Sequence, residues 1–342
     1  MALQSPRRIR LARIPTPIKE LERLSEYVGG PRLFIKRDDL TGIGLTGNKV
    51  RKLEFALAEA LDQGADTVIT TGGLGSNHAR ATAVAARQLG LTPHLVLRGK
   101  PGPYPDGNFL LDGLLNAEVE LITREEYERR NEIMAEIAAN LEKEGRKAYI
   151  IPEGASNAVG VWGYFTAAEE IAHQIATERL PHFDAVITPV GSGGTQAGLL
   201  LGFHYLKLDI PVIGINVCDD EEYFRKRISA LMRDFAERYN YPYELPLEQI
   251  QLIDGYVGRG YALSRPEELE VIKLVARLEG IFLDPVYTGK AMYGLIDQMK
   301  KGRFGKDQKL LFLHTGGIFG LFPKRAAFVG GPDVGEFYED TE

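Results

Sequence analysis

The stretch LTGIGLTGNKVRKLEF (Leu40–Phe55) joins a glycine- and threonine-rich segment directly to a helical pattern. The predicted helix has one apolar face, formed by residues at every fourth position: Leu53, Leu57 and Leu61. Lys49, Arg51 and Lys52 fall in its first turn, where the helix dipole disfavours cations. A bound anion would offset that repulsion; a solvated basic helix start is the alternative. The stretch therefore marks a candidate anion site that contains a candidate reactive amine, Lys49.

Outward from this helix, strand-like and helix-like patterns alternate along the chain. TVITTGG (Thr67–Gly73) predicts a strand, and SNHARATAVAARQLG predicts a helix closed by Gly90. A second block, DAVITPVGSGGTQAGLLLGFHYL, repeats the order of strand, glycine loop and helix. Such alternation is typical of parallel sheets with helices on both faces. We therefore predict an α/β fold of two domains, each with a mostly parallel, open twisted sheet, and a ligand in the cleft between them.

The two blocks of alternation also suggest the domain boundaries. The predicted small domain spans residues 52–160, and the large domain combines residues 1–51 with 161–342. Within them, EEYERRNEIMAEIAANLEKEG (125–145) predicts one long helix and IFLDP (281–285) predicts a strand.

Composition limits the class of protein. The 342 residues, 44% hydrophobic and 26% charged, suit a globular chain of two domains, and the net charge of −6 gives no reason to expect a nucleic-acid partner. The only cysteine, Cys218, follows an apolar run and is predicted to be a buried, inert thiol. No secretory signal is expected, and no apolar run approaches the roughly 20 residues that span a bilayer. These features predict a cytoplasmic protein without a membrane partner, and the polar tail after Lys324 is predicted to fray.

Four predicted strand ends carry unusual glycine and polar content: TTGGLGSNH, TPVGSGGTQ, LDPVYTGK and LHTGG. Ligands bind at the carboxyl ends of strands in open α/β sheets. Each segment alone could be only a tight turn, but four together indicate a binding site at that edge.

The second of these segments predicts an anion cradle. Its backbone N–H groups open a helix, and the loop consists of Gly191, Ser192, Gly193, Gly194 and Thr195. Because Gln196 stands where a dinucleotide fingerprint has its third glycine, and no Walker A lysine follows, the loop favours a single phosphate. Asp219 and Asp220 end the next strand as ribose-binding acids would, so a nucleotide-binding oxidoreductase stays open as an alternative.

Ser76, Asn77 and His78 stand at the start of a predicted helix, where free N–H donors suit a carboxylate. An ordinary N-cap is the alternative. No group of His, Cys, Asp and Glu has metal-ligand spacing, so we predict no metal, and the absence of G-x-S-x-G argues against an α/β hydrolase. A reactive amine, a single-phosphate cradle and a carboxylate pocket together suggest pyridoxal 5′-phosphate (PLP) and an amino acid substrate.

The chain resembles the fold type II, tryptophan synthase β-like PLP enzymes, within the branch of 1-aminocyclopropane-1-carboxylate (ACC) deaminase and D-cysteine desulfhydrase. The resemblance runs nearly end to end through IPTPIKEL, IKRDDLTG, GNKVRKLEF, GSNHARATA, PVGSGGTQAG, GYAL, DPVYTGKAM and LHTGG. It implies that Lys49 binds PLP covalently and moves the Cα proton, while Lys52 and the loop Gly191–Thr195 hold the phosphate. It further implies that Asn77 contacts the ring hydroxyl, and that the protein is a homodimer.

The resemblance also implies the substrate side of the site. Ser76, with the amides of Asn77 and His78, receives the substrate carboxylate, and the Ser76 hydroxyl takes part in proton transfer. Tyr287 flanks the cofactor ring, and Tyr261 lies on the substrate side. Two further residues are implied near the pyridine nitrogen: Thr288 and Thr315.

Two departures from the family pattern bear on the substrate. ACC deaminases carry Glu where this chain has Thr288, and a neutral hydroxyl leaves the cofactor a weaker electron sink than a carboxylate does. Expelling a thiol of pKa ~8.5 needs less of that sink than opening a cyclopropane does, so Thr288 favours β-elimination. Gly75 stands where the family has Gln, which implies an enlarged or rearranged pocket beside the substrate, and HTGGIFGLF differs from the family's HTGGxPALF.

The predicted activity is therefore PLP-dependent α,β-elimination, from D-cysteine to pyruvate, sulfide and ammonia. Alternatives within the family are an L-cysteate sulfo-lyase, a D-serine or β-chloroalanine eliminase, or an ACC deaminase. Outside it stand the nucleotide-binding oxidoreductase and a phosphate- or amino-acid-binding module without catalysis. The sequence leaves the preference for D or L substrates open.

Overall fold

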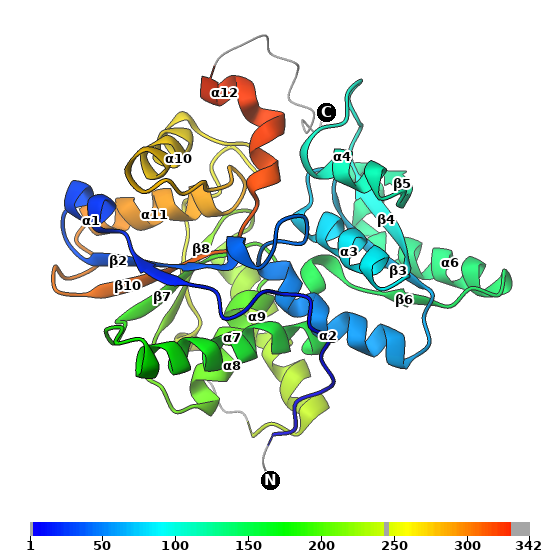
Figure 1. Ribbon diagram of the computed structural model, residues 1–342, viewed down its shortest axis with the longest axis horizontal. Coiled ribbons are helices and arrows are strands. Elements are labelled where there is room, and N and C mark those ends of the chain that lie inside the picture. The colour runs from blue at the N-terminus through cyan, green and yellow to red at the C-terminus, as the bar shows by residue number, and fades with distance from the viewer. Residues whose placement is uncertain (1–2, 243–245, 330–342) are drawn as a thin grey trace.

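The computed structural model describes residues 3–242 and 246–329, which form two sheets lying side by side with helix α2 between them (Figure 1). The larger sheet has the strand order β1(Ile18–Glu20), β2(Arg32–Arg37), β10(Lys309–His314), β7(Ala185–Val190), β8(Val212–Asn216) and β9(Gln251–Ile253). Only the pair β1–β2 is antiparallel. The smaller sheet is entirely parallel, in the order β5(Glu118–Ile122), β4(Thr92–Arg98), β3(Thr67–Gly73) and β6(Ala148–Ile150).

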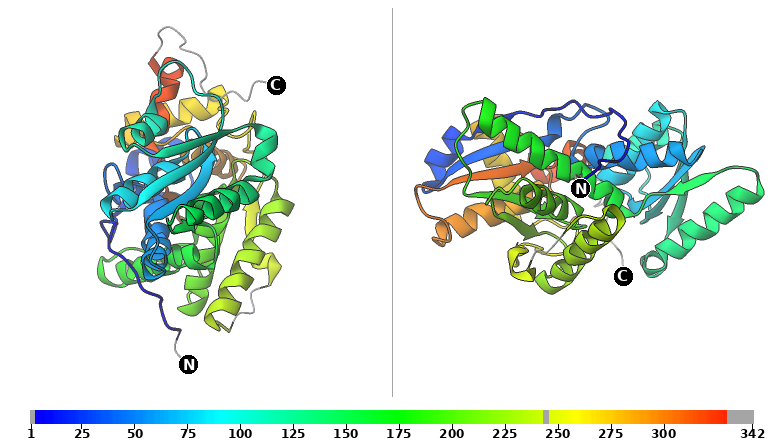
Figure 2. Two further views of the ribbon diagram at one scale, coloured as in Figure 1. Left: turned by 90° about the vertical axis from the view of Figure 1, so that its right-hand side faces the viewer. Right: turned by 90° about the horizontal axis from the view of Figure 1, so that it is seen from below.

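Helices flank the sheets, and those next to the larger sheet cover both of its faces. The helices are α1(Glu22–Val28), α2(Asn48–Asp62), α3(Asn77–Gln88), α4(Gly107–Leu114), α5(Arg124–Glu128), α6(Arg130–Lys143), α7(Ala158–Thr177), α8(Gly194–Tyr205), α9(Glu221–Tyr239), α10(Pro266–Glu279), α11(Thr288–Lys300) and α12(Arg325–Val329). Helices α7, α8 and α9 share a hydrophobic cluster with one face of the larger sheet, and α1, α10 and α11 share another with the opposite face. The predicted α/β class with two mostly parallel sheets is confirmed (Figure 2).

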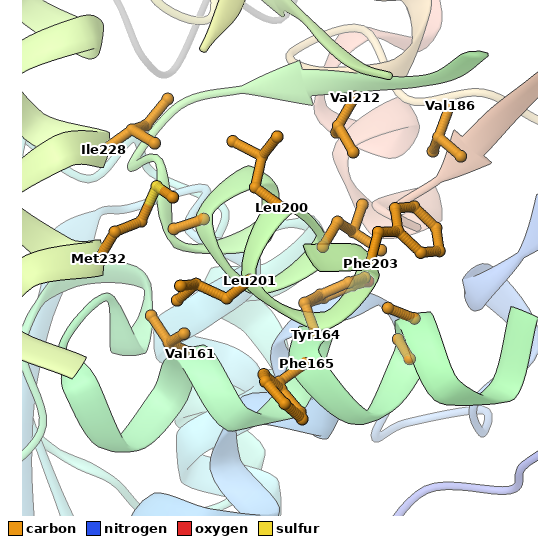
Figure 3. Close-up of a cluster of buried hydrophobic side chains, with 14 of the residues drawn as sticks. Val161, Tyr164, Phe165, Val186, Leu200, Leu201, Phe203, Val212, Ile228 and Met232 are labelled. Carbon is orange, nitrogen blue, oxygen red and sulfur yellow. The ribbon is translucent and has the colours of Figure 1, made fainter. Parts of the chain in front are cut away.

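The side-chain alternation of the strands explains these two layers. Along β2, Phe34 belongs to the cluster with α7 and α8, whereas Leu33 and Ile35 belong to the cluster with α10 and α11. The first cluster is shown in Figure 3, where Leu200 and Phe203 of α8 lie between α7 and the strand residues Val186 and Val212. Because both faces are buried, the central strands β10, β7 and β8 are mostly apolar, as is typical of parallel strands.

Three local predictions are wrong. Residues 281–285 form no strand, because the Asp284 carboxylate accepts the backbone N–H groups of the next turn and leads the chain into α11. Residues 125–145 form two helices, α5 and α6, since the Arg129 N–H bonds to Glu126 O in a tight turn between them. The chain after Lys324 continues as α12 to Val329, and the remaining tail lies outside the described residues.

The strands of the two sheets respect the predicted boundaries, since the smaller sheet lies within residues 52–160 and the larger one outside them. The boundaries themselves stay a prediction. Within the described part of the chain, no helix has both the length and the apolar composition needed to cross a membrane.

Candidate functional site

A cavity of about 660 Å³ opens at the carboxyl ends of strands from both sheets. That volume is within the roughly 300–1,000 Å³ of ligand pockets. The predicted site residues that line it are Lys49, Ser76, Asn77, His78, Gly191, Ser192, Gly193, Thr195, Tyr261, Tyr287 and Thr315. Segments far apart in the chain thus meet because parallel strands end at one edge. The remaining predicted residues, Lys52, Gly75, Gly194 and Thr288, do not line this cavity.

Lys49 is the second residue of α2. Burial lowers the pKa of its ammonium to about 8, although Glu153 and Cys218 act in the opposite direction. A buried amine with such a pKa loses its proton readily and is suited to attack a carbonyl carbon. Its Nζ lies close to the glycine loop, since a Cβ placed on Gly154 would lie 3.4 Å from it and 2.5 Å from Ser192 Oγ.

An added Cβ would displace a neighbouring side chain at Gly191, Gly193 and Gly194 of the glycine loop. A Cβ on Gly191 would lie 2.7 Å from the Tyr287 ring, and one on Gly194 would lie 2.8 Å from Lys52 Nζ. Gly193 has φ 81° and precedes α8, so the loop and the helix N-terminus together present backbone N–H groups. This arrangement fits an anion such as a phosphate.

Lys52 lies directly behind that loop. Its fully buried Nζ donates to Gly154 O and to Ser156 Oγ, both at 3.2 Å, and these partners are neutral. Burial, together with Lys49 and Arg227, lowers its pKa well below the usual value. A buried cation without a counter-charge is costly, so an anion in the cradle would compensate it. Lys52 therefore contributes charge to the cradle without lining the cavity.

The start of α3 forms the wall on the side of the smaller sheet. Ser76 is the N-cap, because its Oγ accepts the Ala79 N–H at 3.1 Å, and the same residue lines the cavity. The N-cap role of Ser76 is thus compatible with a role in binding a ligand carboxylate. The His78 ring bonds to Thr70 Oγ1 at 2.8 Å, and burial lowers its pKa well below the usual value, which keeps the ring neutral.

Two tyrosines lie across the cavity. The Tyr261 and Tyr287 hydroxyls are 2.6 Å apart and share a hydrogen bond. Burial raises the pKa of both phenols, so both stay protonated. A hydrogen-bonded pair of phenols can give a proton to a developing anion and recover it through the pair.

Comparison with known proteins identifies the cofactor. Residues 9–316 match the family of pyridoxal-phosphate dependent enzymes. The chain belongs to this family. It is 47% identical over 326 residues (94% of this chain, 100% of the relative) to a Thermotoga maritima protein with the provisional name 1-aminocyclopropane-1-carboxylate deaminase. It is 45% identical over 92% of its length (79% of the relative) to the bifunctional D-cysteine desulfhydrase/1-aminocyclopropane-1-carboxylate deaminase, mitochondrial, of Arabidopsis thaliana.

A solved structure agrees with this assignment. The crystal structure of an ACC deaminase homologue superposes with a TM-score of 0.87 at 42% identity, over 95% of this chain and 96% of that one. The protein is thus a PLP-dependent enzyme of the ACC deaminase and D-cysteine desulfhydrase family. The oxidoreductase and the non-catalytic binding module, left open by the sequence, are set aside by this membership.

In this PLP-dependent enzyme, the position of Thr288 near the ring nitrogen stays a prediction. Its side chain is fully buried at the start of α11, where Oγ1 donates to the Asp284 carboxylate at 2.7 Å and accepts the Asp284 N–H at 2.7 Å. The hydroxyl is therefore committed to the helix start and does not line the cavity. Thr315, at the end of β10, does line it.

Gly75 also lies beside the main cavity and not in its wall. It lines a side pocket of about 60 Å³ that shares Arg98 and Tyr261 with the main cavity. That Gly75 changes the pocket beside the substrate stays a prediction.

Sequence reasoning missed several groups of the enzyme's site. Arg98, Arg124, Tyr127, Arg130, Glu153 and Arg259 line the cavity, and no motif in the sequence marked them. Cys218 is only partly buried and faces the glycine loop, with Sγ 3.6 Å from Gly191 O. The predicted full burial of Cys218 is wrong, because its side chain lies beside the loop and lines the cavity. The surrounding protein nevertheless raises the pKa of its thiol, and its inertness stays a prediction.

Proposed function

We propose that the enzyme catalyses α,β-elimination on a small β-substituted amino acid, with D-cysteine as the substrate and pyruvate, sulfide and ammonia as products. The observation that carries the proposal is Lys49, a buried amine of lowered pKa, in one cavity with the glycine loop and the Ser76 helix start. When bound, PLP withdraws electrons from the substrate Cα and so allows its proton to leave.

We propose the following roles for the protein's own residues. The N–H groups at the start of α3 and the Ser76 hydroxyl hold the substrate carboxylate. The Lys49 amine takes the proton from Cα, and the Cβ–S bond breaks as the electron pair leaves with sulfur. The Tyr261–Tyr287 pair gives its proton to the departing sulfide. The released three-carbon enamine then hydrolyses in water to pyruvate and ammonia.

The cofactor would be held by groups of both sheets. We propose that Lys49 binds it covalently, that the loop Gly191–Thr195 and Lys52 bind its phosphate, and that Tyr287 flanks its ring. Asn77 would contact the ring hydroxyl, and Thr315 would be the neutral partner of the ring nitrogen. The Thr288 hydroxyl is engaged by Asp284, and the absence of a glutamate at position 288 is what favours a thiol over a cyclopropane.

The test is sulfide release from D-cysteine, with L-cysteine in parallel, by the PLP-loaded protein. We expect release from the D form, and loss of release in Lys49→Ala but not in Lys143→Ala, an exposed lysine on α6. Equal release by Lys49→Ala would refute the assignment of the base. No release from either enantiomer by a PLP-loaded protein would refute the substrate.

ACC deamination is the second candidate, because the bifunctional Arabidopsis relative carries both activities in its name. Ammonia and 2-oxobutanoate formed from ACC would support it. L-Cysteate, D-serine and β-chloroalanine complete the set of substrates to compare. A cytoplasmic location and a homodimer stay predictions, to be checked by fractionation and by light scattering.

A further inference from the structure

A chain of hydrogen bonds leads from a buried arginine to the cavity. Arg80, fully buried on α3, donates its Nε–H to Asn108 Oδ1 at 3.1 Å. Because a guanidinium has only donors, the acceptor end of the Asn108 amide must face Arg80. The other end, Nδ2, then faces away and donates to Gly75 O at 2.7 Å and to Asn77 Oδ1 at 2.9 Å.

The same argument determines the orientation of the next amide. Asn77 Oδ1 is used by Asn108, so the end of the Asn77 side chain left for other contacts is its donor, Nδ2. Asn77 lines the cavity, and its Nδ2 lies near the Gly317 backbone, where an added Cβ would be 3.0 Å away. Among the described residues, none is shown accepting a hydrogen bond from this Nδ2.

Arg80 is itself held in place. Its two terminal nitrogens donate to Gly44 O at 2.6 Å and to Thr46 O at 3.3 Å, in the segment that leads to Lys49. The Phe319 ring lies 5.2 Å from the guanidinium carbon. The amide orientations are therefore fixed from outside the cavity by a group that cannot turn.

We propose that Asn108, oriented by Arg80, is a positioning residue that holds Asn77 as a hydrogen-bond donor toward the ring oxygen of PLP. This inference rests on the proposed contact between Asn77 and that oxygen. A donor stabilises the deprotonated form of an oxygen, so its orientation sets the pH at which the loaded cofactor changes its absorption.

The variant that tests this is Asn108→Asp. A carboxylate still accepts from Arg80, but it has no N–H to give, so it accepts from Asn77 Nδ2 and turns the Asn77 oxygen toward the cofactor. The readout is the pH midpoint of the visible absorption change of the PLP-loaded protein. We expect the midpoint to rise by about one unit or more, because a hydrogen bond to a charged group is lost.

A double-mutant cycle separates the effect that Asn108 exerts through Asn77 from the effect of the added charge. On an Asn77→Ala background, Asn108→Asp should leave the midpoint unchanged, because the amide through which it acts is gone. An equal shift on both backgrounds would overturn the inference, as would no shift in the single variant. Asn108→Ala, which removes the donor without adding charge, should raise the midpoint less, and it is the variant to use if Asn108→Asp does not fold by circular dichroism.

Failure of the proposed function gives a different result. If the wild-type protein shows no visible cofactor band, the proposed binding of PLP is refuted, and the positioning role of Asn108 is refuted with it. If the wild-type band titrates and the Asn108 variants leave its midpoint unchanged, the function stands and the positioning role of Asn108 is refuted.

Discussion

Replacing Gly194 by Ala should weaken PLP binding while leaving the fold intact. The new Cβ would lie 2.7 Å from Ser156 Oγ and 2.8 Å from Lys52 Nζ. Carbon atoms do not approach side-chain atoms so closely, so both groups must shift. Lys52 is buried and bonded to Gly154 O, so its ammonium cannot swing into solvent to relieve the contact.

The magnitude follows from what Lys52 contributes to the cradle. Displacing Lys52 weakens its electrostatic attraction to the phosphate, which at the size of one charge-assisted hydrogen bond is worth about 1.5–3 kcal/mol. The Kd for PLP should therefore rise roughly 10- to 150-fold. The assay is titration of the apoprotein with PLP, followed by absorption and by equilibrium dialysis, since the two methods separate covalent attachment from binding of the phosphate.

The matched control is Gly113→Ala in α4. An added Cβ there meets no atom within 4 Å, so PLP affinity should not change, and the protein should gain about 0.5–1 kcal/mol at most from helix propensity. If Gly194→Ala bound PLP within about twofold of the wild type, well inside the change that loss of one such bond requires, the cradle assigned to this loop would be refuted.

Three further outcomes are expected. Since the pKa of Lys49 is lowered to about 8, the rate of covalent PLP attachment to apoprotein should rise with pH and level off near pH 8. A rate that keeps rising up to the ordinary pKa of a lysine side chain would contradict the lowered pKa. Tyr261→Phe removes the hydroxyl bonded to Tyr287 and should lower kcat at least ~10²-fold with PLP binding retained; unchanged steady-state kinetics would exclude proton transfer by the pair. Asp38→Asn breaks the buried ion pair with Arg51 and should lower the free energy of unfolding in urea by about 3–5 kcal/mol, whereas a loss below ~1 kcal/mol would contradict it.

The Asp38 pair also gives a pH dependence with a definite sign. Burial raises the pKa of the Asp38 carboxyl, but Arg51 outweighs burial and the pKa is lowered overall. A group with a lowered folded-state pKa stabilises the protein above its unfolded pKa, and that stability is lost as pH falls through the folded value. The difference in unfolding free energy between wild type and Asp38→Asn should therefore shrink in acid; a constant difference would show that the pair does not titrate as described.

The sequence by itself determined the class of the fold and the chemistry of the site. The alternation of apolar runs and amphipathic helices depends only on local periodicity, which is why the two parallel sheets were predictable. The glycine loop at Gly191–Thr195 was recognisable because a backbone anion cradle needs small residues next to one another in the chain. Lys49 was recognisable because the glycine-rich segment and the helix start that contains Lys49 are also adjacent in the sequence.

Other features were decided only by the tertiary structure. Whether a hydroxyl faces a cavity or its own helix start depends on backbone direction, and the turn at Asp284 commits Thr288 to the helix start. Lys52 Nζ reaches Gly154 and Gly194 because folding brings these distant segments together, which sequence periodicity cannot reveal.

The orientation of the Asn77 amide shows the same limit most clearly. It depends on Asn108, 31 positions away, and through it on Arg80. One side chain can fix which end of another side chain is the donor only when folding brings the two within about 3 Å. No local sequence pattern therefore predicts this orientation. The residues of the site could be identified from the sequence, but which atom Asn77 presents to the cavity is decided by the tertiary contact between α3 and α4.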